Sequence, residues 1–412
     1  MKLSNSIDLL GTNYIVLSFP CNFIIIFMLL KITCLVDFKK KLNFMGYMRY
    51  KKIIFGLLSV TVFCEPAFLN AQSNAPKYSN EFLAVGVGAR ALGMGNAYVA
   101  ISDDITSGYW NPAGLLGIKS NAQLSLMHAE YFAGIAKYDY AGFAVRVDSS
   151  SVLAFSAVRF GVDNIANTTD LIDANGFVNY DNITSFSAAD YAFLFSYTKQ
   201  LGIPGLRIGA NAKVIRRIVG SFAGAWGFGL DAGAQYDYKK WKFGLMARDI
   251  TSTFNAWSYN LSSDMQTVFQ ETGNEIPQNG LEITLPRVIL GAARKNYFYH
   301  NKISLLTELD VDLTFDGRRN VLFSGEPMSA DPHIGFELGY LDMIFLRAGI
   351  NNIQESTDIN GLPVTNIQPN MGVGIKIKAF TIDYALSNIG STGVGLYSNI
   401  FSLKFDINKI PK

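Results

Sequence analysis

The sequence has little charge, few cysteines and no long apolar run after residue 72. Charged residues make up 17% of its 412 residues, against roughly 25% in a typical soluble domain. All three cysteines lie within the first 64 residues, so the chain beyond them has neither disulfide nor thiol chemistry. A membrane helix needs ~20 consecutive apolar residues, which excludes one from that part of the chain.

The sequence also lacks the spacings that carry catalysis or metal binding. His128, His300 and His333 are far apart, and we expect them at surface or rim positions. The glycine pairs near residues 87 and 228 have neither a strand–loop–helix context nor the Gly-Lys-Ser/Thr ending of a phosphate loop. We therefore expect no enzyme activity, no cofactor and no metal.

What the sequence does contain is aromatic residues and glycine. It has 30 Phe, 20 Tyr and 37 Gly, and aromatics are 13% of the chain. Few charges with many aromatics and glycines indicate a β-rich protein that presents apolar surface to something other than water.

The first 71 residues read as leader sequence. Residues 48–71 have a basic start, an apolar core from Ile53 to Phe63 and a cleavage site after Ala71, as in a signal peptide. We interpret residues 1–47 as an upstream extension that is not native, and a membrane-spanning helix there is the alternative. Removal of residues 1–71 would leave a net charge of about −3, so the basic pI gives no reason to expect nucleic acid as a partner.

Many later segments alternate between apolar and polar residues with a period of two, which is the period of a β-strand. From Ala225 to Asp237, the even-numbered residues are almost all apolar, and the odd-numbered ones are small or polar. The same alternation gives a polar face to neighbouring strands. We expect the following residues to face a lumen: Arg207, Lys213, Asp231, Lys242 and Arg248.

Alternation alone does not decide between a soluble sandwich and a membrane barrel, because either face could be the buried one. Strand length, strand number and connections favour the barrel. The predicted strands run ten residues or so, near the length of a tilted membrane strand, and number about fourteen: 121–131, 135–147, 151–160, 187–199, 205–216, 225–237, 241–250, 283–293, 302–311, 332–340, 343–351, 367–377, 378–388 and 395–406.

The connections between these strands alternate in length. Those after even-numbered strands are short, and those after most odd-numbered strands are long (161–186, 251–282, 312–331 and 352–366). Short periplasmic turns and long extracellular loops are typical of outer-membrane barrels. We therefore predict an all-β fold, a transmembrane antiparallel β-barrel of about 14 strands spanning residues 119–412, in the bacterial outer membrane and in contact with its lipid.

Residues 72–118 precede the first strand and are rich in glycine and alanine, so we predict an N-terminal plug or hatch inside the barrel. Asp103 and Asp104 are adjacent, and neighbouring carboxylates rarely converge on one site, which favours a structural role. Pro112 ends any helix before it. The residues predicted to form the plug are Asp103, Asp104, Trp110, Asn111, Pro112, Ala113 and Gly114.

The sequence resembles a known group in several stretches. "GARALGMGNAYVAISDDITSGYWNPAGL" (88–115) is similar to the N-terminal segment of FadL-like outer-membrane barrels, whose plug carries an Asn-Pro-Ala turn. With "VRFGVDNIANTTDLID" (158–173), "GANAKVIRRIVGSFAGAWGFGLDAG" (209–233) and "FGLMARDITSTFNAW" (243–257), it resembles the PorV/PorQ family more narrowly.

That resemblance implies a fourteen-stranded plugged barrel in bacteria with type IX secretion. The first functional hypothesis is binding of secreted cargo, or of protein partners in a secretion or attachment complex. The aromatics of loop 251–282 are the candidate contacts: Phe254, Trp257, Tyr259 and Phe269. The alternative is a FadL-like transporter with a hydrophobic ligand in the barrel. A continuous apolar path would favour transport, and a plug sealed by salt bridges would oppose it.

Overall fold

The strands carry apolar side chains on their outer face and polar side chains on their inner face. In the computed structural model, Leu309 on β11 is 50% exposed, whereas its neighbours Glu308 and Asp310 are fully buried. Lys213 is likewise buried inside, and Trp226 is exposed outside. Successive strand residues point to opposite sides, so the alternation predicted from the sequence is present, with its apolar side turned outward.

The structure describes residues 79–169, 171–172, 176–357, 361–387 and 398–408. In chain order the strands are β1 Ala122–Tyr131, β2 Ala136–Asp148, β3 Ser151–Asn167, β4 Thr184–Gln200, β5 Leu206–Val219, β6 Ala223–Tyr238, β7 Trp241–Arg248, β8 Phe254–Tyr259, β9 Gly280–Ile283, β10 Arg287–Phe298, β11 Ile303–Thr314, β12 Ser329–Tyr340, β13 Ile344–Thr357, β14 Pro363–Ile377, β15 Phe380–Ser387 and β16 Ser398–Ile407.

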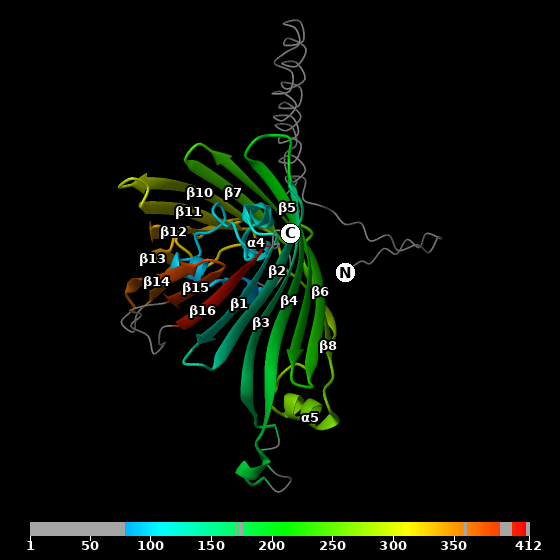
Figure 1. Ribbon diagram of the computed structural model, residues 1–412. Helices are drawn as coiled ribbons and strands as arrows, with labels where there is room; N and C mark the ends of the chain where they lie inside the picture. The colour runs from blue at the N-terminus through cyan, green and yellow to red at the C-terminus, as the bar shows by residue number, and fades with distance from the viewer. Residues whose placement is uncertain (1–78, 170, 173–175, 358–360, 388–397, 409–412) are drawn as a thin grey trace, which may run out of the picture. The chain divides into compact units, whose positions relative to one another are not determined.

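The strands close into a barrel with fourteen positions. Each strand pairs antiparallel with the next along the chain from β1 to β6, and β16 pairs with β1. Sixteen strands fill fourteen positions because two positions are each shared by two strands. β7 and β8 pair with successive parts of β6 and share one position, and β10 and β9, which pair with β7 and β8 respectively, share the next. Figure 1 shows the strands succeeding one another in colour order around the wall. The predicted fold class is confirmed.

Several predicted loops are wrong in their bounds, because strands continue into them. Loop 251–282 contains β8, a helix and most of β9, and in the stretch 352–366 residues 352–357 belong to β13 and residues 363–366 to β14. Stretches 161–186 and 312–331 likewise lose their ends to strands. Backbone hydrogen bonds continue the strand pairing beyond the residues with alternating apolar side chains. A prediction from side-chain alternation therefore ends these strands too early.

A closed wall with an apolar exterior places this protein in the bacterial outer membrane. Lipid offers no hydrogen-bond partner to a backbone, so strands that cross it have to close on themselves. The outward side chains of β14 show the surface that meets lipid: Ile367, Met371, Val373, Ile375 and Ile377 are all exposed. A water-soluble sandwich would bury this face.

Short helical elements occupy the chain before β1 and two of the loops. They are η1 Glu81–Leu83, α3 Ala89–Gly93, α4 Ser107–Trp110, η2 Pro112–Gly117, η3 Tyr180–Asn182 and α5 Ser263–Glu271. No helix among the described residues has the length and apolarity that a membrane crossing requires. The predicted leader (1–47), the predicted signal peptide (48–71) and residues 72–78 lie outside the described residues.

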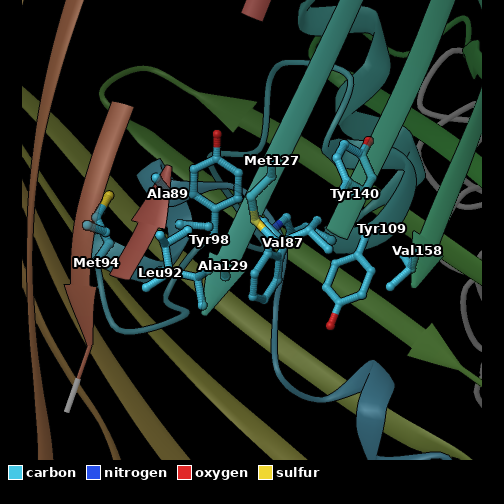
Figure 2. Packing of buried hydrophobic residues seen from close by; sticks show 14 of the residues in the cluster. Val87, Ala89, Leu92, Met94, Tyr98, Tyr109, Met127, Ala129, Tyr140 and Val158 are labelled. Carbon is cyan, nitrogen blue, oxygen red and sulfur yellow. The ribbon is translucent and has the colours of Figure 1, made fainter. Parts of the chain in front are cut away.

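The main apolar core lies between residues 79–118, named the N-terminal segment here, and the inner wall. Figure 2 shows Val87, Tyr98 and Tyr109 of this segment beside Met127 of β1 and Tyr140 of β2. The core is therefore inside the barrel and joins a loop-like segment to strands.

Candidate functional site

The N-terminal segment approaches the wall where the wall has glycines. A Cβ on Gly349 would lie 2.1 Å from the carbonyl carbon of Met94, and one on Gly244 would lie 2.6 Å from the carbonyl oxygen of Val99. Glycine alone permits such an approach because it has no Cβ. Three cross-strand glycine pairs make these contacts: Gly209 with Gly233, Gly244 with Gly291, and Gly335 with Gly349.

Buried ion pairs hold the same segment on strands β12, β13 and β15. Arg90 of α3 lies 2.8 Å from Glu337 of β12, and Arg347 of β13 joins Glu337 at 2.7 Å and Asp383 of β15 at 2.7 Å. The chain of four charges alternates in sign and is largely shielded from water. Removal of one partner from such a group costs roughly 3–5 kcal/mol, since the other is left buried and unpaired.

Two carboxylates of β11 bind the backbone of the segment directly. Asp310 accepts hydrogen bonds from the N–H groups of Tyr98 (2.8 Å) and Val99 (3.0 Å), and Glu308 accepts one from Ala100 (2.6 Å). The three N–H groups belong to a stretch with no regular secondary structure, so without these carboxylates they would lie buried and unsatisfied.

The adjacent aspartates of the segment diverge, as the sequence predicts for a structural role. Asp103 is exposed and pairs with Arg90 at 2.8 Å, whereas Asp104 is buried and pairs with Lys404 of β16 at 2.7 Å. Burial alone would raise the pKa of Asp104, but the Lys404 charge and the hydrogen bond from Thr106 outweigh it and lower the pKa to about 2. Asp104 is thus ionised at every physiological pH.

The Asn-Pro-Ala-Gly turn is a packing element against β6 and β7. The Asn111 side chain accepts from Ala113 N–H and donates to the carbonyls of Val99 and Ala234. Pro112 begins η2, and Gly114 packs where any Cβ would overlap Ser102. Trp110 is buried and donates its indole N–H to Val87. These contacts anchor the turn and leave none of these groups available to a substrate.

Three of the five predicted lumen charges meet near the middle of the wall. Lys213 lies 2.7 Å from Asp231 and 2.5 Å from Asp249. Arg248 donates to the carbonyls of Leu83 and Tyr109. Asp249 is missing from the predicted lumen charges, because the alternation of the predicted strand 241–250 assigns it to the apolar face, whereas β7 ends at Arg248.

The other two predicted lumen charges lie apart from this group. Arg207 and Lys242 both pair with Asp237, at 2.8 and 3.3 Å, close to the turn that joins β6 to β7. This pairing is partly exposed, so its contribution to stability is small.

A cavity of about 550 Å³ lies above the segment at the loop ends of the strands. It is within the usual range of ligand sites. Its lining comes from the segment, from strand ends and from residues 319–321: Glu81, Ala84, Val85, Leu92, Asn96, Tyr131, Phe132, Arg287, Asp312, Thr314, Arg319, Asn320, Val321, Asp331, His333, Asn351, Asn352, Gln354, Gln368, Ser387 and Ser398. Most of these side chains are polar.

A smaller cavity of about 40 Å³ adjoins the first. It extends to the two non-strand stretches that separate β7 from β8 and β9 from β10. The two cavities share Glu81 and its partners Arg287 and Arg319, which lie 3.1 and 2.8 Å from the Glu81 carboxylate. Glu81 therefore separates the two spaces.

The cavity contains a histidine whose role the sequence did not reveal. His333 is only 8% exposed and faces the lumen, so the expected surface or rim position is wrong for it. His128 is half-exposed on the outer face, and His300 lies in the turn after β10. The alternation within β12 assigns His333 to the inner face. It does not predict that His333 lines a cavity, because that cavity is formed by several strands together.

The aromatic candidates for partner binding are mostly in the wall. Phe254, Trp257 and Tyr259 belong to β8, and Phe269 belongs to α5. Trp257 donates its indole N–H to Glu282 at 2.6 Å and lies under the Arg217 guanidinium. Their description as loop residues is wrong for the first three, and their role as partner contacts stays a prediction.

Among the residues that the structure describes, no group of three or more His, Cys, Asp or Glu side chains could hold a metal ion. The charges that hold the N-terminal segment are paired with one another or with backbone groups. The arrangement leaves a cavity of ligand size beside the N-terminal segment, and ion pairs hold that segment to the wall.

Neither a family model nor a curated protein matches the sequence. Among solved structures, the chain is similar to the CymD monoaromatic hydrocarbon channel (TM-score 0.48, 12% identity, covering 79% of this chain and 98% of that one). It is also similar to the Ralstonia pickettii toluene transporter TbuX (0.47, 12%, 78% and 99%) and to a Pseudomonas aeruginosa FadL homologue (0.46, 12%, 78% and 98%). At this level of similarity, fold and function rest on the chain's own geometry.

Proposed function

We propose that the protein is an outer-membrane channel for small solutes, closed at rest by residues 79–118 acting as a plug. The observation that carries the proposal is the cavity of about 550 Å³ enclosed by loop-side strand ends and floored by the segment. A solute from outside the cell would reach this cavity before meeting any seal.

The strength of the fastening differs along the segment, and this difference supports a gate at its beginning. Glu81 is about one-third exposed, and such ion pairs contribute only ~0–1 kcal/mol. Arg90 and Asp104 instead make buried pairs with Glu337 and Lys404. The Glu81 side chain would therefore release Arg287 and Arg319 first, while residues 88–118 stay on the wall. Ion pairs oppose a permanently open pore, so passage requires this movement.

Solute passage has more support than cargo binding, the first hypothesis from the sequence. The aromatics expected to bind partners are largely part of β8, and Trp257 is committed to Glu282. The cavity needs no partner to exist. Membership of the PorV/PorQ family and a role in type IX secretion stay predictions from sequence resemblance.

The test is conductance and solute flux in reconstituted bilayers for the wild type and for Glu81→Gln. We expect low basal flux in the wild type and a severalfold increase in Glu81→Gln, because the variant loses the charge that holds Arg287 and Arg319. Asp342→Asn is the matched control, since Asp342 lies in the exposed turn after β12 at the opposite end. Flux equal to that of protein-free bilayers for both proteins would overturn the proposal.

A further inference from the structure

The wall of the large cavity is unsuited to a bare hydrocarbon. Four consecutive strands each contribute a buried or half-buried polar side chain: Asn351 of β13, Gln368 of β14, Ser387 of β15 and Ser398 of β16. Gln368 donates to Ser387 at 2.7 Å. Side chains of this kind offer hydrogen-bonding positions that a hydrocarbon cannot use.

One end of the cavity has an excess of carboxylates. Asp312 and Asp331 are directly paired across β11 and β12, and both line the cavity. Arg287, the cation nearest to Asp312, lies 3.9 Å from it and also binds Glu81. The ion-pair partner of Asp331 is His333, whose Nε2 lies 3.6 Å from Asp331 Oδ2. The other carboxylate oxygen, Oδ1, has no hydrogen-bond partner.

His333 points to a ligand at the same place. Its Nδ1 donates to the carbonyl oxygen of Gly95 at 3.2 Å, and its Nε2 lies 3.6 Å from Asp331 Oδ2, beyond hydrogen-bond distance. Nε2 has no hydrogen-bond partner although the side chain is more than nine-tenths buried. A buried ring nitrogen and a neighbouring carboxylate oxygen, neither with a hydrogen-bond partner, offer two positions for the polar groups of a ligand.

The geometry points to a small hydroxylated amine, of the amino-sugar class, as the ligand of this cavity, with its ammonium on Asp331 and a hydroxyl group hydrogen-bonded to His333 Nε2. The inference rests on the proposed function, for which this cavity is the site of uptake. An ammonium–carboxylate hydrogen bond is charge-assisted and about twice as strong as a neutral one. Val85, Leu92 and Phe132, which also line the cavity, would contact the less polar face of a sugar ring.

The experiment compares glucosamine, glucose and toluene as ligands of the full chain in lipid nanodiscs, by calorimetry at neutral pH against empty nanodiscs. Glucose has a hydroxyl where glucosamine has the amine, so the pair isolates the charge. We expect glucosamine to bind at least tenfold more tightly than glucose, and toluene to show no binding above empty nanodiscs. This comparison uses the wild type alone and stands even if a variant fails to assemble.

Asp331→Asn then tests the assigned residue. We expect about tenfold weaker glucosamine binding with glucose binding unchanged, and no change for either ligand in Asp342→Asn. Equal binding of glucose and glucosamine, or tighter binding of toluene, would overturn the ligand class and leave the channel intact. Absence of flux for all three solutes through both wild type and Glu81→Gln would overturn the proposed channel itself.

Discussion

The Nζ of Lys213 lies 2.7 Å from Asp231 Oδ1, in a place that water does not reach: both side chains are at most 3% exposed. The same ammonium also forms an ion pair with Asp249 at 2.5 Å. One cation thus neutralises two carboxylates at the level where β7 ends. Loss of the Lys213 ammonium would leave the Asp231 and Asp249 carboxylates buried together without a cation, next to the end of β7.

Lys213→Met should therefore destabilise the barrel by roughly 3–5 kcal/mol. The measurement is urea unfolding of the refolded protein in detergent, followed by the shift of the folded band on a semi-native gel. Lys242→Met is the control, since its pair with Asp237 is partly exposed and is worth about 0–1 kcal/mol. Equal stabilities of the two variants would contradict the buried pair.

Gly349→Ala should loosen the segment from the wall. The new methyl group would lie 2.1 Å from Met94 C, and the backbone atoms there cannot yield as a side chain would. Overpacking of this kind costs roughly 1–3 kcal/mol. Limited proteolysis should cut residues 79–118 faster in this variant than in Gly202→Ala, whose Cβ meets nothing within 4 Å. Identical cleavage rates would show that the segment does not depend on this approach.

Asp104 should make stability depend on pH only in strong acid. Its pKa is about 2 in the folded protein and 3.8 for the free side chain, so the folded state prefers the ionised form. The pair with Lys404 is fully present above pH 3.8 and is lost as the pH falls toward 2. The shift corresponds to ~2 kcal/mol. Unfolding free energies of wild type and Asp104→Asn should differ by this amount at pH 6 and converge near pH 2. A constant difference across this range would disprove the assignment.

Leu309→Arg should test whether the outer face of β11 meets lipid. Leu309 lies well inside β11, half-exposed, and an arginine facing the bilayer midplane costs about 2–4 kcal/mol in a barrel. Leu341 is as exposed but lies in the turn after β12, where the cost falls to about 0–1 kcal/mol. Folding into lipid vesicles measures both. A neutral effect of Leu309→Arg would mean that water covers this face.

Much of the wall could be predicted because strand periodicity is local. The residues from Ala225 to Asp237 carry their face assignment in their own order, and Lys213 and Asp231 follow from it. The strand ends could not be predicted in the same way. β3 continues to Asn167 and β13 to Thr357, since pairing there depends on backbone hydrogen bonds with a neighbour and on no pattern of side chains.

The candidate site was only partly foreseeable for a related reason. Adjacent carboxylates such as Asp103 and Asp104 rarely converge on one site, and the two aspartates pair with different residues, Arg90 and Lys404. His333 gave no sign of its cavity, and the pairing of Glu81 with Arg287 and Arg319 joins residues more than 200 positions apart. Partners at such separations are decided by closure of the barrel.

By itself the sequence determined the alternation, the approximate number of strands and the small-residue character of the segment before them, because each depends on neighbours within a few positions. Only the tertiary structure decided that the apolar face is the outer one, that glycine pairs receive the segment, and that Asp331 and His333 share a cavity. These features depend on strands from distant parts of the chain closing into one barrel. Only then do the unpaired groups of Asp331 and His333 on β12 face a cavity lined by other strands.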